Sequence, residues 1–434
     1  MKQRLSHYNN RIIIDKHSVI YNSLTGDSVF IKNRQLGSLD ELEKLCQIDQ
    51  SLEKNLINAG ILVDTDYDEI KELEKRIMEG INGNEEYTLH INPTLDCNFR
   101  CWYCYEEHLM GSNMKDEVLS NTLDFISKIV EREDIKCLDL GFFGGEPLLY
   151  FEKAAKKIIQ FAYDVCRKFG KSLNISFTSN GYALTDEIIE FLSQYSCGFQ
   201  ITLDGGREDH NLTRFAKNGS GSYDKIVSNI HKLVKSGIRA IVRINFTSKN
   251  VDSVGGIYNS FSEIENEYRK YISFDFQRVW QDRESGQDEA ERKISNIREY
   301  FRENGFAVHT NYIPKDVRIP CYADKENYIL INYNGDIFGC TARDFKTENR
   351  IGVLKESGKI LYEDSFEERR KYKFSKALCR TCRIAPICGG GCIQRSYESR
   401  DTDKCTLGYS EEDKDNAVIN ILDWVISNES NLTN

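Results

Sequence analysis

Ten of the 14 cysteines fall into two dense groups, and their spacing restricts the fold more than any other feature of the chain. The first group is Cys97, Cys101 and Cys104, spaced C-x3-C-x2-C. The second holds seven cysteines near the C-terminus: Cys321, Cys340, Cys379, Cys382, Cys388, Cys392 and Cys405. Such groups indicate either a disulfide framework or metal sites, and the redox compartment decides between them.

The sequence predicts a cytoplasmic protein that does not associate with a membrane. Met1–Arg4 leads into polar residues without the long apolar run of a secretory signal. No apolar stretch approaches the roughly 20 residues that span a bilayer. Because cytoplasmic thiols are kept reduced, the grouped cysteines are predicted to be metal ligands.

The charge balance argues against nucleic acid as a partner. The chain carries 58 basic and 68 acidic side chains, a formal net charge of −10. A polyanion would be repelled at long range, so binding to DNA or RNA is not expected.

The first cysteine group allows two metal sites on spacing alone. A structural zinc needs a fourth ligand, such as His90 or His108. A cubane [4Fe–4S] cluster normally takes four cysteines, so three would leave one iron open to another molecule.

The central part of the chain alternates strand and helix patterns, which indicates a parallel sheet. Strands are expected at residues 89–91, 137–143, 173–178, 199–203, 239–246 and about 272–279. Helices are expected at residues 116–129, 151–169, 186–192 and 223–234. Six such strands predict an α/β fold with a partial (β/α)6 barrel of the TIM type, with its chemistry on the loops after the strands.

The flanking segments differ from this pattern, so we expect four parts: residues 1–80, 81–310, 311–410 and 411–434. The first begins with short strands at residues 12–14, 18–21 and 29–31, followed by two helices and a strand at 61–63. The cysteine-rich part has too little apolar periodicity for an ordinary core, and metal clusters could replace one. An amphipathic helix over residues 411–427 closes the chain.

The first cysteine group resembles that of the radical S-adenosylmethionine (SAM) superfamily. The shared features are the C-x3-C-x2-C spacing, the aromatic Tyr103 before the third cysteine, and the place of the loop after the first strand. The resemblance implies a [4Fe–4S] cluster on Cys97, Cys101 and Cys104 whose open iron binds the amino and carboxylate groups of SAM. Electron transfer then yields a 5′-deoxyadenosyl radical that abstracts hydrogen from a substrate.

The same resemblance implies a set of residues that contact SAM. Gly144-Gly145-Glu146-Pro147 is similar to the GGEP segment that binds the SAM amine in this family. An arginine binds a carboxylate through two parallel hydrogen bonds, which suits Arg214. The implied cofactor-binding residues are Tyr103, Gly144, Gly145, Glu146, Ser179, Asn180, Thr202 and Arg214.

The second cysteine group, with Gly335 and Gly389–Gly391, is similar to the SPASM domain that follows many radical SAM cores. Two structural zincs are the alternative. The resemblance implies two auxiliary [4Fe–4S] clusters, the first on Cys321, Cys340 and Cys392 and the second on Cys379, Cys382, Cys388 and Cys405. An eighth cysteine found in some members is absent, so the first auxiliary cluster has an open iron or another ligand.

The other cysteines lie in apolar segments and are predicted to be buried, inert thiols. They are Cys46, Cys137, Cys166 and Cys197.

Enzymes with SPASM domains commonly act on peptides, and residues 1–80 resemble the winged-helix leader-recognition domain of maturases of ribosomally made peptides. Its segment Tyr21–Gly26 is typical of that sheet. The resemblance implies a precursor peptide whose leader binds as an added strand. It also implies a reducing partner such as flavodoxin or ferredoxin. The expected reaction is a crosslink, either a thioether or a carbon–carbon bond.

Three alternatives stay open on the sequence: a formylglycine-generating enzyme like the anaerobic sulfatase maturases, a peptide epimerase, and a non-catalytic iron–sulfur or zinc scaffold. No general base is identified, since Asp275, Asp282 and Glu106 are candidates by position alone.

Overall fold

The computed structural model describes residues 2–14, 17–32, 36–46, 49–83, 85–216, 219–282, 287–309 and 316–432. The chain divides into two compact units, and each is described by itself. The terminal unit combines residues 1–84, 312–326 and 367–434, and the sheet unit combines residues 85–311 and 327–366. The expected boundary between residues 310 and 311 lies outside the described residues.

The sheet unit is an α/β fold built on one large, mostly parallel sheet. Its parallel strands lie side by side in chain order. They are β6 (Glu86–Ile91), β7 (Cys137–Phe142), β8 (Ser172–Ser179), β9 (Cys197–Leu203), β10 (Arg239–Phe246), β11 (Ile272–Arg278) and β12 (Ala307–Val308). The six strands predicted from the sequence are confirmed, and the short β12 is added to them.

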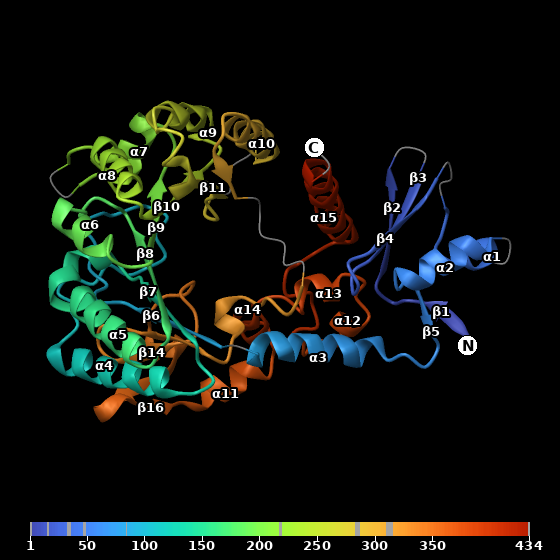
Figure 1. The fold of residues 1–434 in the computed structure, drawn as a ribbon, viewed down its shortest axis with the longest axis horizontal. Helices are drawn as coiled ribbons and strands as arrows, with labels where there is room; N and C mark the ends of the chain where they lie inside the picture. Colours follow the sequence, from blue (N-terminus) through green and yellow to red (C-terminus); the bar gives the residue numbers. More distant parts are fainter. Residues whose placement is uncertain are drawn as a thin grey trace. The chain divides into compact units, whose positions relative to one another are not determined.

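Helices connect these strands, and Figure 1 shows them on the outer side of the sheet. The connecting helices are α4 (Asp116–Glu131), α5 (Lys156–Lys168), α6 (Asp186–Leu192), α7 (Arg207–Thr213), α8 (Tyr223–Lys235), α9 (Val251–Val254) and α10 (Gln287–Glu303). A π-helical turn, Phe151–Ala155, precedes α5. The sequence predicted α4, the α5 region, α6 and α8.

The two faces of the sheet differ in polarity. In β9, Phe199, Ile201 and Leu203 are buried and belong to the core that includes the helices. The residues between them, Gln200 and Thr202, are only half-buried. Parallel strands covered on both faces are apolar throughout. The alternation therefore indicates that one face packs on helices and the other lines a polar space.

Four further strands extend the sheet beyond β6. They are β13 (Tyr328–Ile331), β14 (Asp336–Phe338), β15 (Arg350–Lys355) and β16 (Lys359–Tyr362). The first pairs with β6 in parallel, and the other three follow as antiparallel neighbours. Part of the cysteine-rich segment thus belongs to the same sheet as the predicted core.

The terminal unit contains two small sheets. β2 (Asn9–Ile14), β3 (His17–Asn22) and β4 (Ser28–Ile31) form an antiparallel sheet, as the sequence predicted. β1 (Gln3–Leu5), which was not predicted, pairs with β5 (Leu62–Asp64). The helices α1 (Glu41–Cys46) and α2 (Gln50–Asn58) join them, and Ile20, Leu42 and Leu56 share one apolar core.

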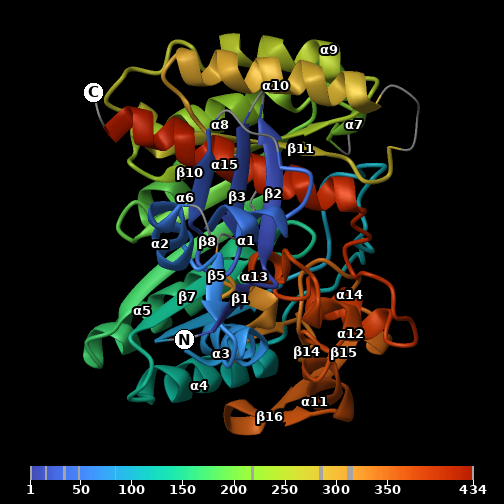
Figure 2. The same cartoon turned by 90° about the vertical axis from the view of Figure 1, so that its right-hand side faces the viewer.

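The rest of the terminal unit comes from more distant parts of the chain. These are α3 (Glu69–Asn82) and the short helices α12 (Ala377–Arg380), α13 (Ala385–Cys388) and α14 (Ile393–Glu398), followed by α15 (Glu411–Leu432). The helix α11 (Asp364–Arg370) begins within the residue range of the sheet unit and ends within that of the terminal unit. Val418, Ile421 and Leu422 of α15 pack with Ile12 and Val19 of the three-stranded sheet. Figure 2 shows β2 and β3 crossing α15. In the described part of the chain, no helix combines the length and apolar character needed to cross a membrane.

Candidate active site

The sequence-predicted residues of the sheet unit gather at the carboxyl ends of its parallel strands. The loop after β6 carries Cys97, Cys101 and Cys104, and the next two loops carry Gly144–Glu146 and Asn180. The carboxyl ends of neighbouring parallel strands lie on one edge of a sheet, where active sites of such folds are found.

Burial of the three cysteines increases from the third to the first. Cys104 is exposed, Cys101 half-buried and Cys97 buried. The Phe99 N–H lies 3.4 Å from Cys97 Sγ. Burial, and to a smaller extent the nearby charge of Glu146, raise the pKa of the Cys97 thiol to about 12. A thiolate there needs a compensating cation, which a bound iron would supply.

The histidines of the alternative zinc site lie in different surroundings. His108 Nε2 is 3.4 Å from Cys104 Sγ, beside the cysteine loop. His90 Nδ1 instead lies 3.1 Å from the Tyr328 hydroxyl, between two strands of the sheet. Within the described residues, no three His, Cys, Asp or Glu side chains are gathered around a position for a single metal ion.

The glycines after β7 are required by a close approach to the cysteine loop. A Cβ at Gly145 would lie 2.3 Å from the Asp96 carbonyl oxygen, and one at Gly144 would lie 2.5 Å from that of Thr94. Gly144 also has φ +108°, which favours glycine. The Gly145 and Glu146 N–H groups donate to the Thr94 and Asp96 carbonyls. This loop therefore supports the backbone that leads into Cys97.

The Glu146 side chain connects the loop after β7 to the end of β8. Its side chain is fully buried. Oε1 accepts hydrogen bonds from the Ser179 hydroxyl at 2.8 Å and the Leu148 N–H at 3.1 Å, and Oε2 accepts from the Asn180 N–H at 2.7 Å. Burial raises the pKa of this carboxyl, and these three donors oppose that rise. Protein donors thus occupy the carboxylate, which the sequence did not reveal.

Asn180 connects the end of β8 to the cysteine loop. Its Nδ2 donates to Asn98 Oδ1 at 2.7 Å and lies 3.9 Å from Cys97 Sγ. Its Oδ1 accepts from the Tyr182 N–H at 2.9 Å, which fixes the amide orientation.

A second network centres on the Tyr103 hydroxyl. It donates to the Asp204 carboxylate, at 2.6 and 2.8 Å from the two oxygens. It accepts from Arg214 Nη1 at 2.8 Å and Asn245 Nδ2 at 3.1 Å. Arg214 Nη1 lies 3.8 Å from Asp204, and both side chains are at least nine-tenths buried. Burial raises the pKa of Asp204, whereas Arg214 and the Tyr103 hydroxyl lower it.

One hydrogen-bond donor of Arg214 is unused in the described part of the chain. Its buried Nε has no hydrogen-bond partner among the described residues. A buried unpaired donor of a charged group is costly, and an anionic ligand would satisfy it. Thr202, predicted to act with Arg214, lies on β9 opposite Arg243 of β10 and is half-buried.

A cavity of about 450 Å³ adjoins the Tyr103 network. The residues that line it come from the loops after β6, β9, β10 and β11, together with α7: Trp102, Tyr103, Asp204, Asp209, Leu212, Thr213, Asn245, Thr247, Lys249, Asn250, Val279, Gln281 and Asp282. Asp204 lies two positions after Thr202, one of the residues predicted from the sequence, whereas Asn245 was not predicted. Its position at the end of a predicted strand is the signal that could have identified it.

In the terminal unit, four predicted ligands line one small cavity. They are Cys379, Cys382, Cys388 and Cys405, which the resemblance assigns to the second auxiliary cluster. Cys388, Cys382 and Cys405 act electrostatically on Cys379, after the larger effect of burial, and so raise its pKa. The spacing C-x2-C-x5-C with a distant fourth cysteine thus brings together the predicted set.

The three cysteines assigned to the first auxiliary cluster are divided between the units. Cys321 and Cys392 belong to the terminal unit, and Cys340 to the sheet unit. Their common site therefore stays a prediction.

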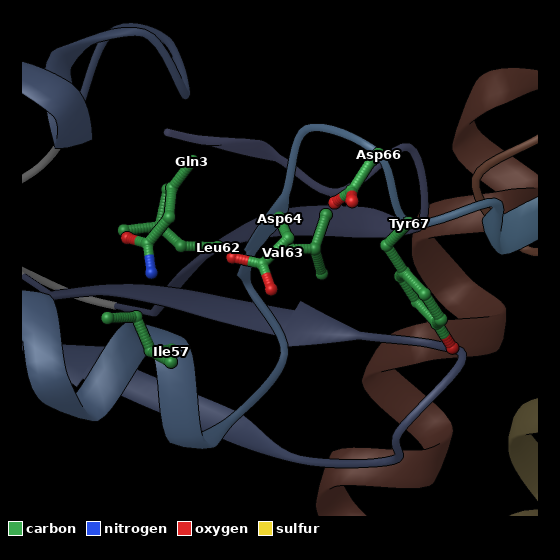
Figure 3. A pocket seen from close by; sticks show the side chains of 7 residues that line it. All are labelled: Gln3, Ile57, Leu62, Val63, Asp64, Asp66 and Tyr67. Atoms are coloured by element: carbon green, nitrogen blue, oxygen red, sulfur yellow. The ribbon is translucent and has the colours of Figure 1, made fainter. Parts of the chain in front are cut away.

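A second cavity of the terminal unit, of about 460 Å³, lies beside the β1–β5 sheet. Figure 3 shows Gln3 and Ile57 on one side of it and Tyr67 on the other, with Asp64 and Asp66 between. None of the residues predicted from the sequence lines it.

Residues 91–259 match the Radical SAM superfamily. This segment starts at the end of β6 and contains the three-cysteine loop, the glycine loop after β7 and the Tyr103 network.

The chain is also similar to two groups of curated enzymes. A cysteine-type anaerobic sulfatase-maturating enzyme of Clostridium perfringens is 22% identical over 74% of this chain and 92% of its own length. The radical SAM cyclopropyl synthase TigE of Paramaledivibacter caminithermalis is 22% identical over 91% of this chain and 90% of its own.

Two solved structures share the fold. The structure named native anSMEcpe with bound AdoMet has a TM-score of 0.60 at 18% identity and covers 80% of this chain and 99% of its own. Streptococcus suis SuiB bound to precursor peptide SuiA has a TM-score of 0.52 at 13% identity and covers 92% of this chain and 97% of its own. At these identities the likeness concerns the fold alone.

Proposed function

Because the chain is a radical SAM enzyme, we propose that it is a peptide maturase that installs a crosslink, either a thioether or a carbon–carbon bond, in a ribosomally made precursor peptide. The strongest support is the three-cysteine loop, held by the glycine loop after β7 and flanked by a cavity lined by both polar and apolar side chains. A radical generated at the three-cysteine loop would therefore form next to a cavity that can admit a peptide side chain.

Cys97, Cys101 and Cys104 hold the [4Fe–4S] cluster of this proposal. When bound, the cluster and SAM supply the 5′-deoxyadenosyl radical that takes a hydrogen atom from the peptide. The unpaired Nε of Arg214 supports a carboxylate ligand at that side chain. Tyr103 keeps the guanidinium in place through its hydroxyl.

The other residues proposed to contact SAM lie at or near the carboxyl ends of β7, β8 and β9. Backbone groups of Gly144 and Gly145 would bind the amine of SAM, and Glu146, with its three protein donors, fixes that loop. Ser179, Asn180 and Thr202 complete the proposed set. Asn180 Nδ2 can also donate to the sulfur of Cys97, from which it is 3.9 Å away.

The cysteine-rich segment, residues 311–410, is proposed to be a SPASM domain with two auxiliary [4Fe–4S] clusters. The cavity lined by Cys379, Cys382, Cys388 and Cys405 supports the second of them. Its thiol set suits iron, and its apolar walls keep water from the sulfurs. Cys321, Cys340 and Cys392 would hold the first, with one position left to another ligand.

We propose that residues 1–80 recognise the leader of the precursor as a winged-helix-like domain. β3 pairs on both sides, whereas β4 pairs with β3 alone among the described strands. Its other edge offers backbone N–H and C=O groups to an added strand, with the half-exposed Phe30 beside them. A flavodoxin or ferredoxin would supply electrons in a reducing cytoplasm.

The proposed reaction balances without a further oxidant. One peptide hydrogen leaves as an atom and ends in 5′-deoxyadenosine, and the second leaves as a proton. SAM is cleaved to methionine and 5′-deoxyadenosine by one electron, and bond formation in the peptide returns one electron. The overall change is the loss of two hydrogens from the peptide for each SAM consumed.

A formylglycine-generating activity is the second candidate, and the similarity to a sulfatase-maturating enzyme over 74% of the chain favours it. That reaction converts a cysteine or serine side chain to an aldehyde and makes no bond between residues. A peptide epimerase would instead leave the mass of the peptide unchanged.

The test is anaerobic reconstitution of the full chain with iron and sulfide, followed by SAM, reductant and a candidate precursor peptide from a short reading frame beside the gene. We expect about twelve irons per chain, 5′-deoxyadenosine, and a peptide lighter by two hydrogens whose fragmentation is blocked between two residues. The control is the variant with alanine at Cys97, Cys101 and Cys104. Unblocked fragmentation with an aldehyde would favour formylglycine formation, and absence of 5′-deoxyadenosine would refute the radical mechanism.

A further inference from the structure

The cavity lined by the four cysteines also contains one ammonium group. Besides Cys379, Cys382, Cys388 and Cys405, its described lining consists of uncharged residues and Lys414. The uncharged ones are mostly apolar, such as Leu378, Ile384 and Leu407. Lys414 is therefore the charged residue among the described ones that line the cavity, while Lys376 acts electrostatically on Cys379 and Lys373 on Cys388 from outside the lining.

Lys414 lies in the first turn of α15, and 18% of its side chain is exposed. Its Nζ forms an ion pair with Glu411 of the same turn. The hydrogen bond to Glu411 raises its pKa. The ammonium therefore stays charged at neutral pH.

The charges around Lys414 are unequally exposed. Glu411 is 72% exposed, so water and salt screen its negative charge. Arg383 also pairs with Glu411 and with Asp415, at 3.2 and 2.8 Å. The less exposed Lys414 faces the cavity, where the dielectric is lower and its field on the sulfurs is stronger.

We propose that Lys414 raises the reduction potential of the auxiliary cluster held by Cys379, Cys382, Cys388 and Cys405. The inference rests on the proposed function, because it needs a cluster at those cysteines. Four thiolates give an iron–sulfur cluster a net negative charge, and uptake of one electron adds another. A neighbouring ammonium stabilises the reduced form more than the oxidised form.

The redox step involves one electron and no bond change. In the proposed crosslinking the electron comes from the peptide as its second hydrogen leaves as a proton, and in the test it comes from dithionite. A raised potential makes this cluster a better acceptor for that electron. Lys414 therefore acts on this electron transfer through the charge of its ammonium group.

The experiment is a reductive titration of the reconstituted full-length protein, followed by electron paramagnetic resonance. The step that belongs to this cluster is the one that disappears when Cys379 and Cys382 are both replaced by alanine. In Lys414→Met we expect that step to move to lower potential while the other steps stay in place. Lys414→Arg, which keeps the charge, should leave it near the wild-type value.

Two further variants complete the test. Lys371→Met removes an exposed lysine of the same unit and should shift no step. Glu411→Gln removes the counter-charge of Lys414 and should move the step to higher potential.

Each outcome bears on a distinct claim. An unchanged step in Lys414→Met with full iron content overturns the role of Lys414 and leaves the cluster assignment intact. If Lys414→Met loses the cluster, Glu411→Gln decides, and an unchanged step there refutes the proposal. If replacing Cys379 and Cys382 removes neither iron nor a reduction step, the cluster assignment and the role of Lys414 both fail.

Discussion

Tyr103 and Asp204 are hydrogen-bonded across 101 positions of the chain, with the phenolic oxygen 2.6 Å from the nearer carboxylate oxygen. The contact joins the cysteine loop after β6 to the end of β9. Because Arg214 and Asn245 donate to the same hydroxyl, one oxygen atom fixes three other side chains.

Tyr103→Phe is expected to weaken SAM binding by roughly tenfold, since leaving buried polar partners unpaired costs about 1–3 kcal/mol. Equilibrium binding of SAM to the reconstituted protein measures it. Tyr105→Phe is the control, because its hydroxyl donates to a single carbonyl, that of Thr341, and its side chain is 48% exposed. Equal effects of the two changes would show that the Tyr103 network does not support the SAM site.

Gly145→Ala is expected to abolish loading of the first cluster, because the added Cβ would overlap the Asp96 carbonyl oxygen at 2.3 Å. The backbone before Cys97 would have to move. Iron content and the yield of 5′-deoxyadenosine measure the loss. Gly256→Ala, where no atom lies within 4 Å of the added Cβ, should keep both.

Cys379→Ala is expected to lower the iron content by about four atoms per chain. Cys197→Ala is the matched control, because both thiols are buried, with 7% and 5% of the residue exposed, and only Cys379 lines the four-cysteine cavity. Iron and sulfide analysis measures the difference. Equal losses would indicate general destabilisation instead of a lost ligand.

His90 should make the sheet unit less stable in acid. Burial lowers the pKa of its imidazole to about 4, against about 6.5 in an unfolded chain. Between these pH values the unfolded chain binds a proton that the folded chain does not. The folding stability is therefore unaffected by protonation of His90 above pH 6.5 and decreases as the pH falls towards 4.

The free energy of unfolding decreases by at most about 1.4 kcal/mol for each pH unit in this range. His90→Gln should therefore show a smaller drop in melting temperature from pH 7 to pH 5 than the wild type does. His7→Gln changes an exposed imidazole and should behave like the wild type. The same drop in all three proteins would exclude His90 as the titrating group.

Phe30→Asp is expected to weaken binding of the precursor leader by at least tenfold, since its half-exposed ring flanks the open edge of β4. Fluorescence anisotropy of a labelled precursor measures it. Ile13→Asp alters a residue of similar exposure, 47% against 49%, on β2 instead of β4. A stronger effect at Ile13 would place the leader on the other edge of the sheet.

The local patterns predicted the parallel strands well. The apolar runs that became β7, β9 and β10 lie between helices of clear 3.6-residue periodicity, and the expected helix at residues 186–192 has the bounds of α6. The resemblance to the SPASM domain assigned to one site the four cysteines that line the cavity of the terminal unit. In these cases the signal lies within a short stretch of sequence.

Pairings between distant segments were not predictable in this way. Nothing in Tyr328–Ile331 reveals that it joins the sheet next to β6. The role of Glu146 depends on donors from Ser179 and Asn180, which only the packing of β7 against β8 brings near. Asn245 lies at the end of a predicted strand, but its hydrogen bond to the Tyr103 hydroxyl depends on the folded structure.

The pairing of β6 with β13 has a consequence for biosynthesis. Leu89 of β6 lies opposite Ile329, so this side of the strand has no neighbour until the ribosome has made most of the chain. Until then the segment that precedes Cys97 stays an exposed edge, open to pairing with another nascent chain. The backbone that leads into Cys97 is therefore enclosed on both sides only after residues 328–331 have been synthesised.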